Sequence, residues 1–311
     1  MTKVDKTIRF IDLFAGIGGM RLGFERNGMS CVFSSEWDPN SQKTYAANFG
    51  HTPFGDITQI QAQEIPDFEV LLAGFPCQPF SSIGKRQGFE HPTQGTLFYD
   101  VVRILEHHKP PAFLLENVKG LVNHDKGRTW QIIQETLLDL GYTVHAKVLD
   151  AADYGLPQHR ERIYIVGFNN SLPKGQEFEW PNKVDKKANI GDFVEIGIDD
   201  RSISKRLQAS YIYKLNDGRP EVIDSSTTGT VKTLVASYHK IQRLTGTFVA
   251  DGPTGLRLLS ENECKGIMGF PEDFKVPVSR TQMYRQFGNS VAVPVIELIA
   301  AQMKKVMVSQ L

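Results

Sequence analysis

A cysteine between two prolines is the residue of this chain best suited to nucleophilic chemistry. Cys77 lies in Gly74-Phe75-Pro76-Cys77-Gln78-Pro79, directly after the apolar run 70–73. That run predicts a buried parallel strand, and the proline-bearing sequence after it ends the strand. Open α/β sheets carry reactive groups at the carboxyl ends of their strands, so Cys77 is a candidate nucleophile. Lone cysteines are as often inert packing, and the unusual loop sequence favours the catalytic interpretation here.

A carboxyl group and two arginines are expected near this cysteine. Glu116 ends the apolar run 112–116, which predicts a strand that places Glu116 at the same edge of the sheet as Cys77. A carboxyl group buried there resists ionisation and could share a proton with a ring nitrogen; the alternative is a cap or an ion pair. Arg160 and Arg162 flank the start of the run 163–168. Their forked donors suit a carbonyl or phosphate, although alternating arginines at an edge are commonly solvated.

A glycine-rich turn after the first apolar run predicts a ligand that the backbone approaches closely. Gly16 and Gly18 lie between the run 8–13 and a helix-compatible stretch. Such turns form nucleotide sites at helix amino termini. Arg21 occupies the position of the third glycine in a GxGxxG motif, and this departure disfavours a pyrophosphate cofactor.

Three side chains between the second and third apolar runs could complete an adenosyl site. Glu36 ends the run 31–35 and suits the hydroxyl groups of a ribose. Trp37 could stack on an adenine, and Asp56 could accept a hydrogen bond from its amino group. Singly, Trp37 is more often a packing residue and Asp56 a turn residue. Together they indicate an adenosyl ligand without phosphates.

The elements that must position these residues alternate between two hydrophobic patterns. Apolar runs at 8–13, 31–35, 70–73, 112–116, 143–149 and 163–168 predict strands, and helical stripes at 97–108 and 130–140 predict core-facing helices. Another helix is expected at 291–308, and Ser260 begins a capping box before a short helix. The pattern predicts an α/β fold with a doubly wound, mostly parallel sheet.

Composition narrows the class of protein. The 311 residues carry 35 basic and 35 acidic side chains, so nucleic-acid binding would need local charge asymmetry. Cys31, Cys77 and Cys264 have no metal-ligand spacing, and we expect neither disulfides nor a metal site, with Cys264 as core packing. The polar amino terminus and the absence of a run of about 20 apolar residues predict a cytoplasmic protein without a membrane segment.

The pattern changes at about residue 173, where a second domain is expected. Between residues 201 and 243, eight lysines and arginines oppose three acidic residues, an excess of eight minus three, or five. Interleaved tyrosines and this charge predict a duplex contact, against the alternative of a small irregular β domain with solvated lysines. We therefore expect a catalytic domain over 1–172, a smaller irregular β-rich recognition domain over 173–257, and a return to the catalytic domain over 258–311.

Ordered motifs carry a family resemblance over nearly the whole chain. Phe14-Ala15-Gly16-x-Gly18-Gly19, Pro76-Cys77-Gln78, Glu116-Asn117-Val118, Gln158-x-Arg160-x-Arg162 and Gln286-Phe287-Gly288-Asn289-Ser290-Val291 follow one another. In this order they resemble the DNA (cytosine-5)-methyltransferases, especially the compact bacterial members of restriction-modification systems. Only the stretch 173–257 lies outside the resemblance. The resemblance implies the methyltransferase fold, with S-adenosylmethionine as cofactor and double-stranded DNA as partner.

The resemblance also implies residue roles. Cys77 would be the nucleophile that adds to cytosine C6, Glu116 would contact N3 and the amino group, Arg162 would contact O2, and Arg160 would support the site. The cofactor positions are Phe14, Gly16, Gly18, Glu36, Trp37, Asp56, Ile57, Phe75, Pro76, Leu97, Asn289, Ser290 and Val291. The polar, glycine-bearing segment after Cys77 predicts a lid over a flipped base, against the alternative of a solvated surface loop, with DNA contacts at Gln78, Ser81, Lys85 and Arg86. In the recognition domain the expected DNA contacts are Thr233, Tyr238 and Lys240.

Three rival functions share parts of this pattern. A nicotinamide dehydrogenase would share the glycine turn and Glu36, but it leaves Cys77, Glu116 and the basic region unexplained. A transfer-RNA methyltransferase would use the same chemistry, and a comparison of substrates separates the two. A non-catalytic DNA-binding protein should lack an intact nucleophile and donor site. We expect a monomer that functions alongside a restriction endonuclease without a required stable complex.

Overall fold

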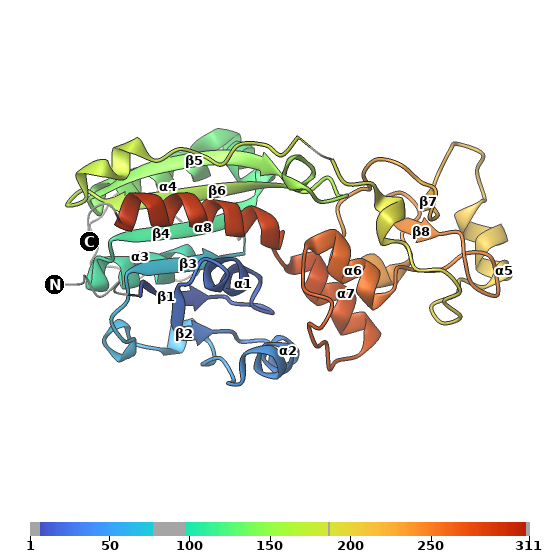
Figure 1. Ribbon diagram of the computed structural model, residues 1–311, viewed down its shortest axis with the longest axis horizontal. Coiled ribbons are helices and arrows are strands. Elements are labelled where there is room, and N and C mark those ends of the chain that lie inside the picture. Colours follow the sequence, from blue (N-terminus) through green and yellow to red (C-terminus); the bar gives the residue numbers. More distant parts are fainter. Residues whose placement is uncertain (1–6, 77–96, 186, 309–311) are drawn as a thin grey trace.

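The computed structural model describes residues 7–76, 97–185 and 187–308 (Figure 1). Its strands are β1 (Arg9–Leu13), β2 (Ser30–Ser35), β3 (Val70–Gly74), β4 (Ala112–Val118), β5 (Tyr142–Asp150), β6 (Glu161–Asn169), β7 (Glu221–Ile223) and β8 (Thr247–Val249). Its α-helices are α1 (Gly19–Glu25), α2 (Pro39–Phe49), α3 (Leu97–His108), α4 (Arg128–Asp139), α5 (Lys205–Leu207), α6 (Glu261–Met268), α7 (Arg280–Asn289) and α8 (Val293–Val308).

Six strands form one sheet in the order β2-β1-β3-β4-β6-β5. β1 pairs in parallel with β2 and β3, and β3 pairs in parallel with β4. β6 is antiparallel to both β4 and β5. The chain leaves β1 toward β2 on one side and resumes at β3 on the other, which creates a switch point at the carboxyl ends of β1 and β3. The six predicted strands and the mostly parallel, doubly wound class are confirmed.

Helices cover both faces of the sheet (Figure 1). One buried cluster joins Phe10, Leu72 and Leu114 to α1 and α8, and a second joins Leu71 and Phe113 to α3 and α4. These strand residues alternate in sequence, so successive side chains enter opposite cores. Each strand is therefore held on both sides, which explains why its sequence is a continuous apolar run.

Two glycines let the first helix lie against the last. A Cβ at Gly19 would lie 2.9 Å from Ser290 Oγ, and one at Gly23 would lie 2.6 Å from Ile296 Cγ2. The contact is closed by Asn27 Nδ2, which donates to the Glu297 carbonyl at 2.9 Å. Helix α8 is thus packed directly against α1.

A third buried cluster crosses the expected boundary at residue 258. It joins Ile203 and Phe248, from the region around the two-stranded β7–β8 pair, to Cys264 on α6 and Phe287 on α7. In Figure 1, α6 and α7 lie beside that region, whereas α8 returns to the sheet. The three-part domain division stays a prediction.

Local predictions near the carboxyl end are confirmed. Ser260 and Glu263 form the capping box of α6, Cys264 is fully buried, and the helix expected at 291–308 is α8. Within the described residues, the helices fall short of the length and hydrophobicity needed to span a bilayer.

Candidate functional site

A cavity of about 350 Å³ opens at the switch point of the sheet. Such a volume is within the usual range of small-molecule sites, roughly 300–1,000 Å³. Its walls include most of the predicted cofactor and catalytic positions: Phe14, Gly16, Glu36, Trp37, Phe75, Pro76, Leu97, Glu116, Arg160, Arg162, Asn289, Ser290 and Val291. Residues from the start, middle and end of the chain therefore share one site.

Glu116 and Arg162 form an ion pair on neighbouring strands. Arg162 Nε lies 3.1 Å from Glu116 Oε1, and both side chains are largely buried. The register of the sheet accounts for the pairing, because Glu116 lies opposite Gly74 on β3 and Val118 lies opposite Arg162 on β6. Gly74 adds no side chain in front of the carboxyl group, so a planar ring could approach it from the β3 side.

Burial raises the pKa of Glu116, and the charges of Arg162 and Arg160 oppose that shift. A carboxyl group in this position keeps its proton to a higher pH than an exposed glutamate does. At the same time the arginines stabilise negative charge beside it. The pair can therefore share a proton with a ring nitrogen and donate hydrogen bonds to a neighbouring carbonyl.

Arg160 is buried and its guanidinium binds backbone carbonyls. It donates to the Leu234 carbonyl at 3.1 Å, to the Gly288 carbonyl at 3.0 Å and to the Ser290 carbonyl. Burial and the nearby Arg162 lower the pKa of Arg160 to about 9. Arg160 thus ties together three backbone segments around the pocket, and its supporting role in the reaction stays a prediction.

The turn that leads to Cys77 is anchored by Asn117. Asn117 Nδ2 donates to the Phe75 carbonyl at 2.8 Å, which ties the end of β4 to the chain just after β3. Pro76 is the last described residue of this stretch, and it lies in the wall of the cavity. The predictions for Cys77, Gln78, Ser81, Lys85 and Arg86 lie outside the described residues.

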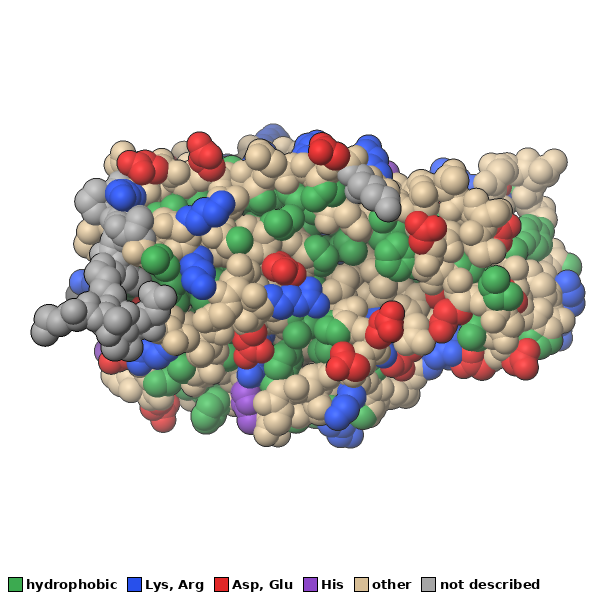
Figure 2. All heavy atoms as spheres, in the orientation of Figure 1, with side chains coloured by type: hydrophobic (Ala, Val, Ile, Leu, Met, Phe, Trp, Pro, Cys, Tyr) green, Lys and Arg blue, Asp and Glu red, His purple; other side chains and the backbone are tan. Residues whose placement is uncertain are grey.

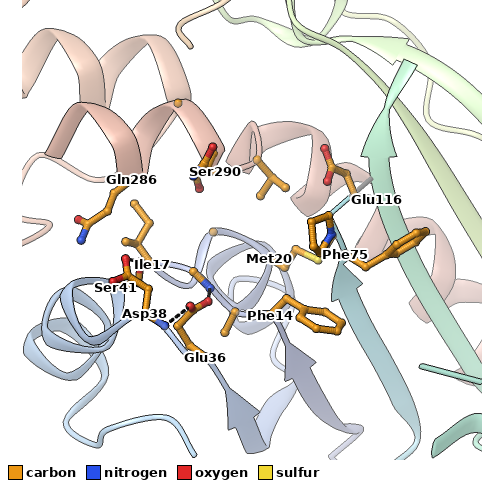
Figure 3. Close-up of a pocket in the computed structure, with 18 of the residues that line it drawn as sticks. Phe14, Ile17, Met20, Glu36, Asp38, Ser41, Phe75, Glu116, Gln286 and Ser290 are labelled. Carbon is orange, nitrogen blue, oxygen red and sulfur yellow. Dashed lines mark hydrogen bonds between the residues drawn. The ribbon is translucent and has the colours of Figure 1, made fainter. Parts of the chain in front are cut away.

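Glu36 organises the glycine-rich turn (Figure 3). Its two carboxylate oxygens accept hydrogen bonds from the backbone N–H groups of Gly16 and Asp38, both at 2.8 Å. Burial raises the pKa of Glu36, and these backbone bonds oppose the shift. In Figure 3, Glu36 and Glu116 lie at different ends of the pocket, with Met20 between them. Free lone pairs on Glu36 can still accept from hydroxyl groups of a ligand.

Three predicted cofactor positions do not form walls of this cavity. Gly18 has φ +84°, and a Cβ there would lie 2.2 Å from the ring of Phe49, so the turn and its packing on α2 both require glycine here; its role toward a ligand stays a prediction. Asp56 is exposed and accepts a hydrogen bond from the Thr58 amide at 3.0 Å. Ile57 is buried in the second core cluster. Roles for Asp56 and Ile57 toward an adenine stay predictions.

Two polar wall residues were assigned no role by the sequence interpretation. Asp12 is buried at the end of β1, and its Oδ2 atom has no hydrogen-bond partner among the described residues. Gln286 is also buried, and the same holds for its Nε2 atom. Their positions next to the glycine-rich turn and the Gly288-Asn289-Ser290 motif were the available signal. Unpaired buried polar groups beside a cavity indicate that it takes a polar ligand.

The three DNA contacts predicted within residues 173–257 differ in solvent exposure. Lys240 is exposed, whereas Thr233 is partly buried and donates to the His159 carbonyl. Tyr238 is buried and donates to the Thr247 carbonyl, so the expected DNA contact by this side chain is not supported. Its ring instead packs 5.0 Å from that of Tyr284. A tyrosine can fill a core if its hydroxyl finds a partner, and sequence does not reveal that partner.

The sequence count does not show which basic side chains of this region are free at the surface. Arg243 is buried, paired with Asp217, and donates to the Ile212 carbonyl at 2.8 Å. On the face shown in Figure 2, basic and acidic side chains are interspersed. Cations bound inside the fold do not attract DNA, so exposed residues such as Lys240 must supply the attraction.

The sheet order, the switch-point cavity and the Glu116–Arg162 pair together define an α/β domain of the methyltransferase class. In agreement, the fold matches the Dnmt2 methyltransferase of S. pombe with a TM-score of 0.76 and 21% identity, over 96% of this chain and 99% of that one. At this identity the match concerns the fold.

The family follows from the sequence comparisons. The family model described as C-5 cytosine-specific DNA methylase matches residues 8–305, and the chain belongs to that family. It is 60% identical over 294 residues to the Type II methyltransferase M.MspI of Moraxella sp, covering 94% of this chain and 70% of that protein. It is 41% identical over 308 residues to M.HhaI of Haemophilus parahaemolyticus, covering 94% and 93%. The protein is therefore a DNA (cytosine-5)-methyltransferase.

Proposed function

We propose that this enzyme transfers a methyl group from S-adenosylmethionine to C5 of a cytosine in a short specific sequence of duplex DNA, through a covalent bond between Cys77 and C6. The observation that carries the proposal is the buried Glu116–Arg162 pair, 3.1 Å apart, in one cavity with Glu36. The pair suits the N3 and O2 edge of a pyrimidine, and Glu36 suits a ribose.

Each of the three side chains Cys77, Glu116 and Arg162 has a distinct chemical role in the proposed reaction. Cytosine C5 is a poor nucleophile, and addition of the Cys77 thiolate to C6 moves electron density onto C5. Glu116 supplies a proton or hydrogen bond at N3, and Arg162 stabilises the developing charge at O2. C5 then takes the methyl group, a base removes the C5 proton, and the electrons of that C–H bond expel the thiolate. The target base must leave the duplex stack to reach these groups.

The cavity residues fit S-adenosylmethionine, which supplies a methyl group activated by a sulfonium. Glu36 would accept from its ribose hydroxyls, and the ring of Phe14 offers the sulfonium a negative face. Trp37 is 67% exposed at the rim, where an adenine could cover it. The unpaired atoms of Asp12 and Gln286 provide hydrogen-bonding capacity for the polar end of such a ligand.

The relatives suggest the biological setting. The Moraxella and Haemophilus proteins are named Type II methyltransferases, the modifying partners of restriction systems. We propose the same setting here: a monomeric, cytoplasmic enzyme that protects host DNA from a cognate endonuclease. Bisulfite sequencing of DNA from cells expressing the protein should show one cytosine methylated within one recurrent word. Uniformly unmethylated DNA from cells with abundant folded protein would count against the proposal.

Replacing Glu36 by alanine should weaken S-adenosylmethionine binding about 10- to 100-fold, because charge-assisted hydrogen bonds contribute roughly 1.5–3 kcal/mol. The change also removes acceptors for the amides of Gly16 and Asp38. Calorimetry would measure the affinity, with Glu64→Ala as a control for loss of an exposed carboxylate that also binds a backbone amide. Unchanged affinity in folded Glu36→Ala would remove Glu36 from the cofactor site.

Exchanging residues 173–257 should transfer sequence preference without changing the reaction. The chimera would carry the corresponding region of the Haemophilus relative, and sequencing after bisulfite treatment would identify its target. Base-edge contacts specify the sequence, and the catalytic residues lie elsewhere in the chain. An active chimera that still methylates the original word would place recognition outside this region.

A further inference from the structure

The residues that precede β6 run beside part of the recognition region. We call residues 157–160 the junction segment and residues 231–236 the recognition segment. The Val231 amide donates to the Pro157 carbonyl at 2.9 Å, and the His159 amide donates to the Val231 carbonyl at 2.8 Å. These two bonds form a short parallel bridge that fixes the register of one segment on the other.

Gln158 extends the contact inside the protein. Its side chain is fully buried, its Oε1 accepts from the Leu234 amide at 2.7 Å, and its Nε2 donates to the Ile267 carbonyl at 3.0 Å. A buried amide with both ends bonded resists displacement, because any shift leaves a polar group unpaired. The recognition segment is therefore held to both the junction segment and α6.

Arg160 connects this contact to the cavity. Its guanidinium donates to the Leu234 carbonyl of the recognition segment and to the carbonyls of Gly288 and Ser290. Gly288 and Ser290 are cavity walls. A buried cation depends on its acceptors, so movement of Leu234 and movement of the cavity wall each disturb the same group.

Gly288 brings the two backbones together without a side chain between them. A Cβ at this position would lie 2.2 Å from the Ala236 nitrogen and 2.4 Å from the Val235 carbonyl carbon. Close-packed backbone atoms transmit displacement, because the interior has little free volume to absorb it. The cavity wall and the recognition segment thus meet at Gly288 and again at Arg160.

We propose that Arg160 and Gly288 are positioning residues that couple the cofactor pocket to the recognition region, so that bound DNA and bound cofactor strengthen each other's affinity. The inference rests on the proposed function. By linkage, the factor by which DNA tightens cofactor binding equals the factor by which the cofactor tightens DNA binding.

The test compares binding of S-adenosylhomocysteine, the non-reactive product, with and without a duplex that carries the methylated word found by bisulfite sequencing. In the unaltered enzyme the duplex should tighten binding by about 5- to 150-fold, the usual range for coupled sites. In Gly288→Ala this factor should fall below about twofold; because the readout is the ratio of the two affinities, it is independent of any change in affinity without DNA. Gly120→Ala is the matched control, because a Cβ there meets nothing within 4 Å.

Two further variants keep the test decisive if Gly288→Ala does not fold. Thr233→Val removes the hydroxyl that donates to the His159 carbonyl near the protein surface, and Arg160→Lys removes the forked donor. Both should reduce the coupling factor. If enzyme and duplex bind but the factor is near one in the unaltered protein, or if folded variants retain it, the inference is wrong. If neither ligand binds the unaltered enzyme, the proposed function itself fails.

Discussion

Cys77→Ser should lose methylation almost completely, by a factor that reaches roughly 10⁶ when a covalent nucleophile is removed. A serine hydroxyl at neutral pH is a far weaker nucleophile than a thiolate, so C6 is not attacked and C5 is not activated. The assay would follow transfer of labelled methyl groups to duplex DNA. Binding of DNA and cofactor should persist, because the substitution changes one atom.

A trapping experiment tests the covalent step directly. With fluorine at C5 of the target cytosine, methyl transfer leaves no proton to remove, so the bond between Cys77 and C6 is not released. The unaltered enzyme should give a denaturant-resistant complex linked through the peptide that contains Cys77, and Cys77→Ser should give none. Cys31→Ser and Cys264→Ser are the controls. Normal turnover by Cys77→Ser, or a link mapped to Cys31 or Cys264, would overturn the mechanism.

Glu116→Gln should lower the rate of methyl transfer about 10²- to 10⁴-fold, the usual contribution of a positioned acid or base. An amide can accept or donate a hydrogen bond but cannot pass a proton to N3. DNA affinity should change little, because the charge that Glu116 stabilises develops only during addition. Glu161→Gln is the control, since Glu161 is an exposed neighbour paired with Lys119.

The pH dependence of the rate gives a second readout of Glu116. Burial raises its pKa, so the folded enzyme keeps the proton to a higher pH than the unfolded chain does. The stability gained from holding this proton is present at low pH and is lost as pH rises through the folded pKa. The Glu116-dependent part of the rate should fall over the same rise, and Glu116→Gln should lack that component. A variant with the unaltered pH profile and rate would exclude the proton role.

Most of the fold was predictable because the sheet is buried on both faces. Continuous apolar runs such as 70–73 and 112–116 have few alternatives to central strands. The antiparallel direction of β6 was not predictable from its own pattern, since direction depends on the connection and the neighbour. The capping box at Ser260 was found because it uses only residues adjacent in sequence.

Site residues that depend on distant partners were harder to interpret. Gly18 carries the sequence signature of a ligand-binding turn, but its missing Cβ accommodates Phe49, more than 30 residues away. Arg243 counts as surface charge in the sequence and is neutralised internally by Asp217. Tyr238, predicted to contact DNA, is likewise buried in the core. In each case the deciding contact is tertiary and leaves no local pattern.

The packing of α1 on α8 has a consequence for biosynthesis. The cavity takes Gly16 and Glu36 from one part of the chain, and Ser290 and Val291 from a part that follows Glu36 by more than 250 residues. A chain emerges from the ribosome amino end first. The cavity therefore cannot close while only the first half of the described residues has emerged, and it is complete only after α8 has been released and docked on α1.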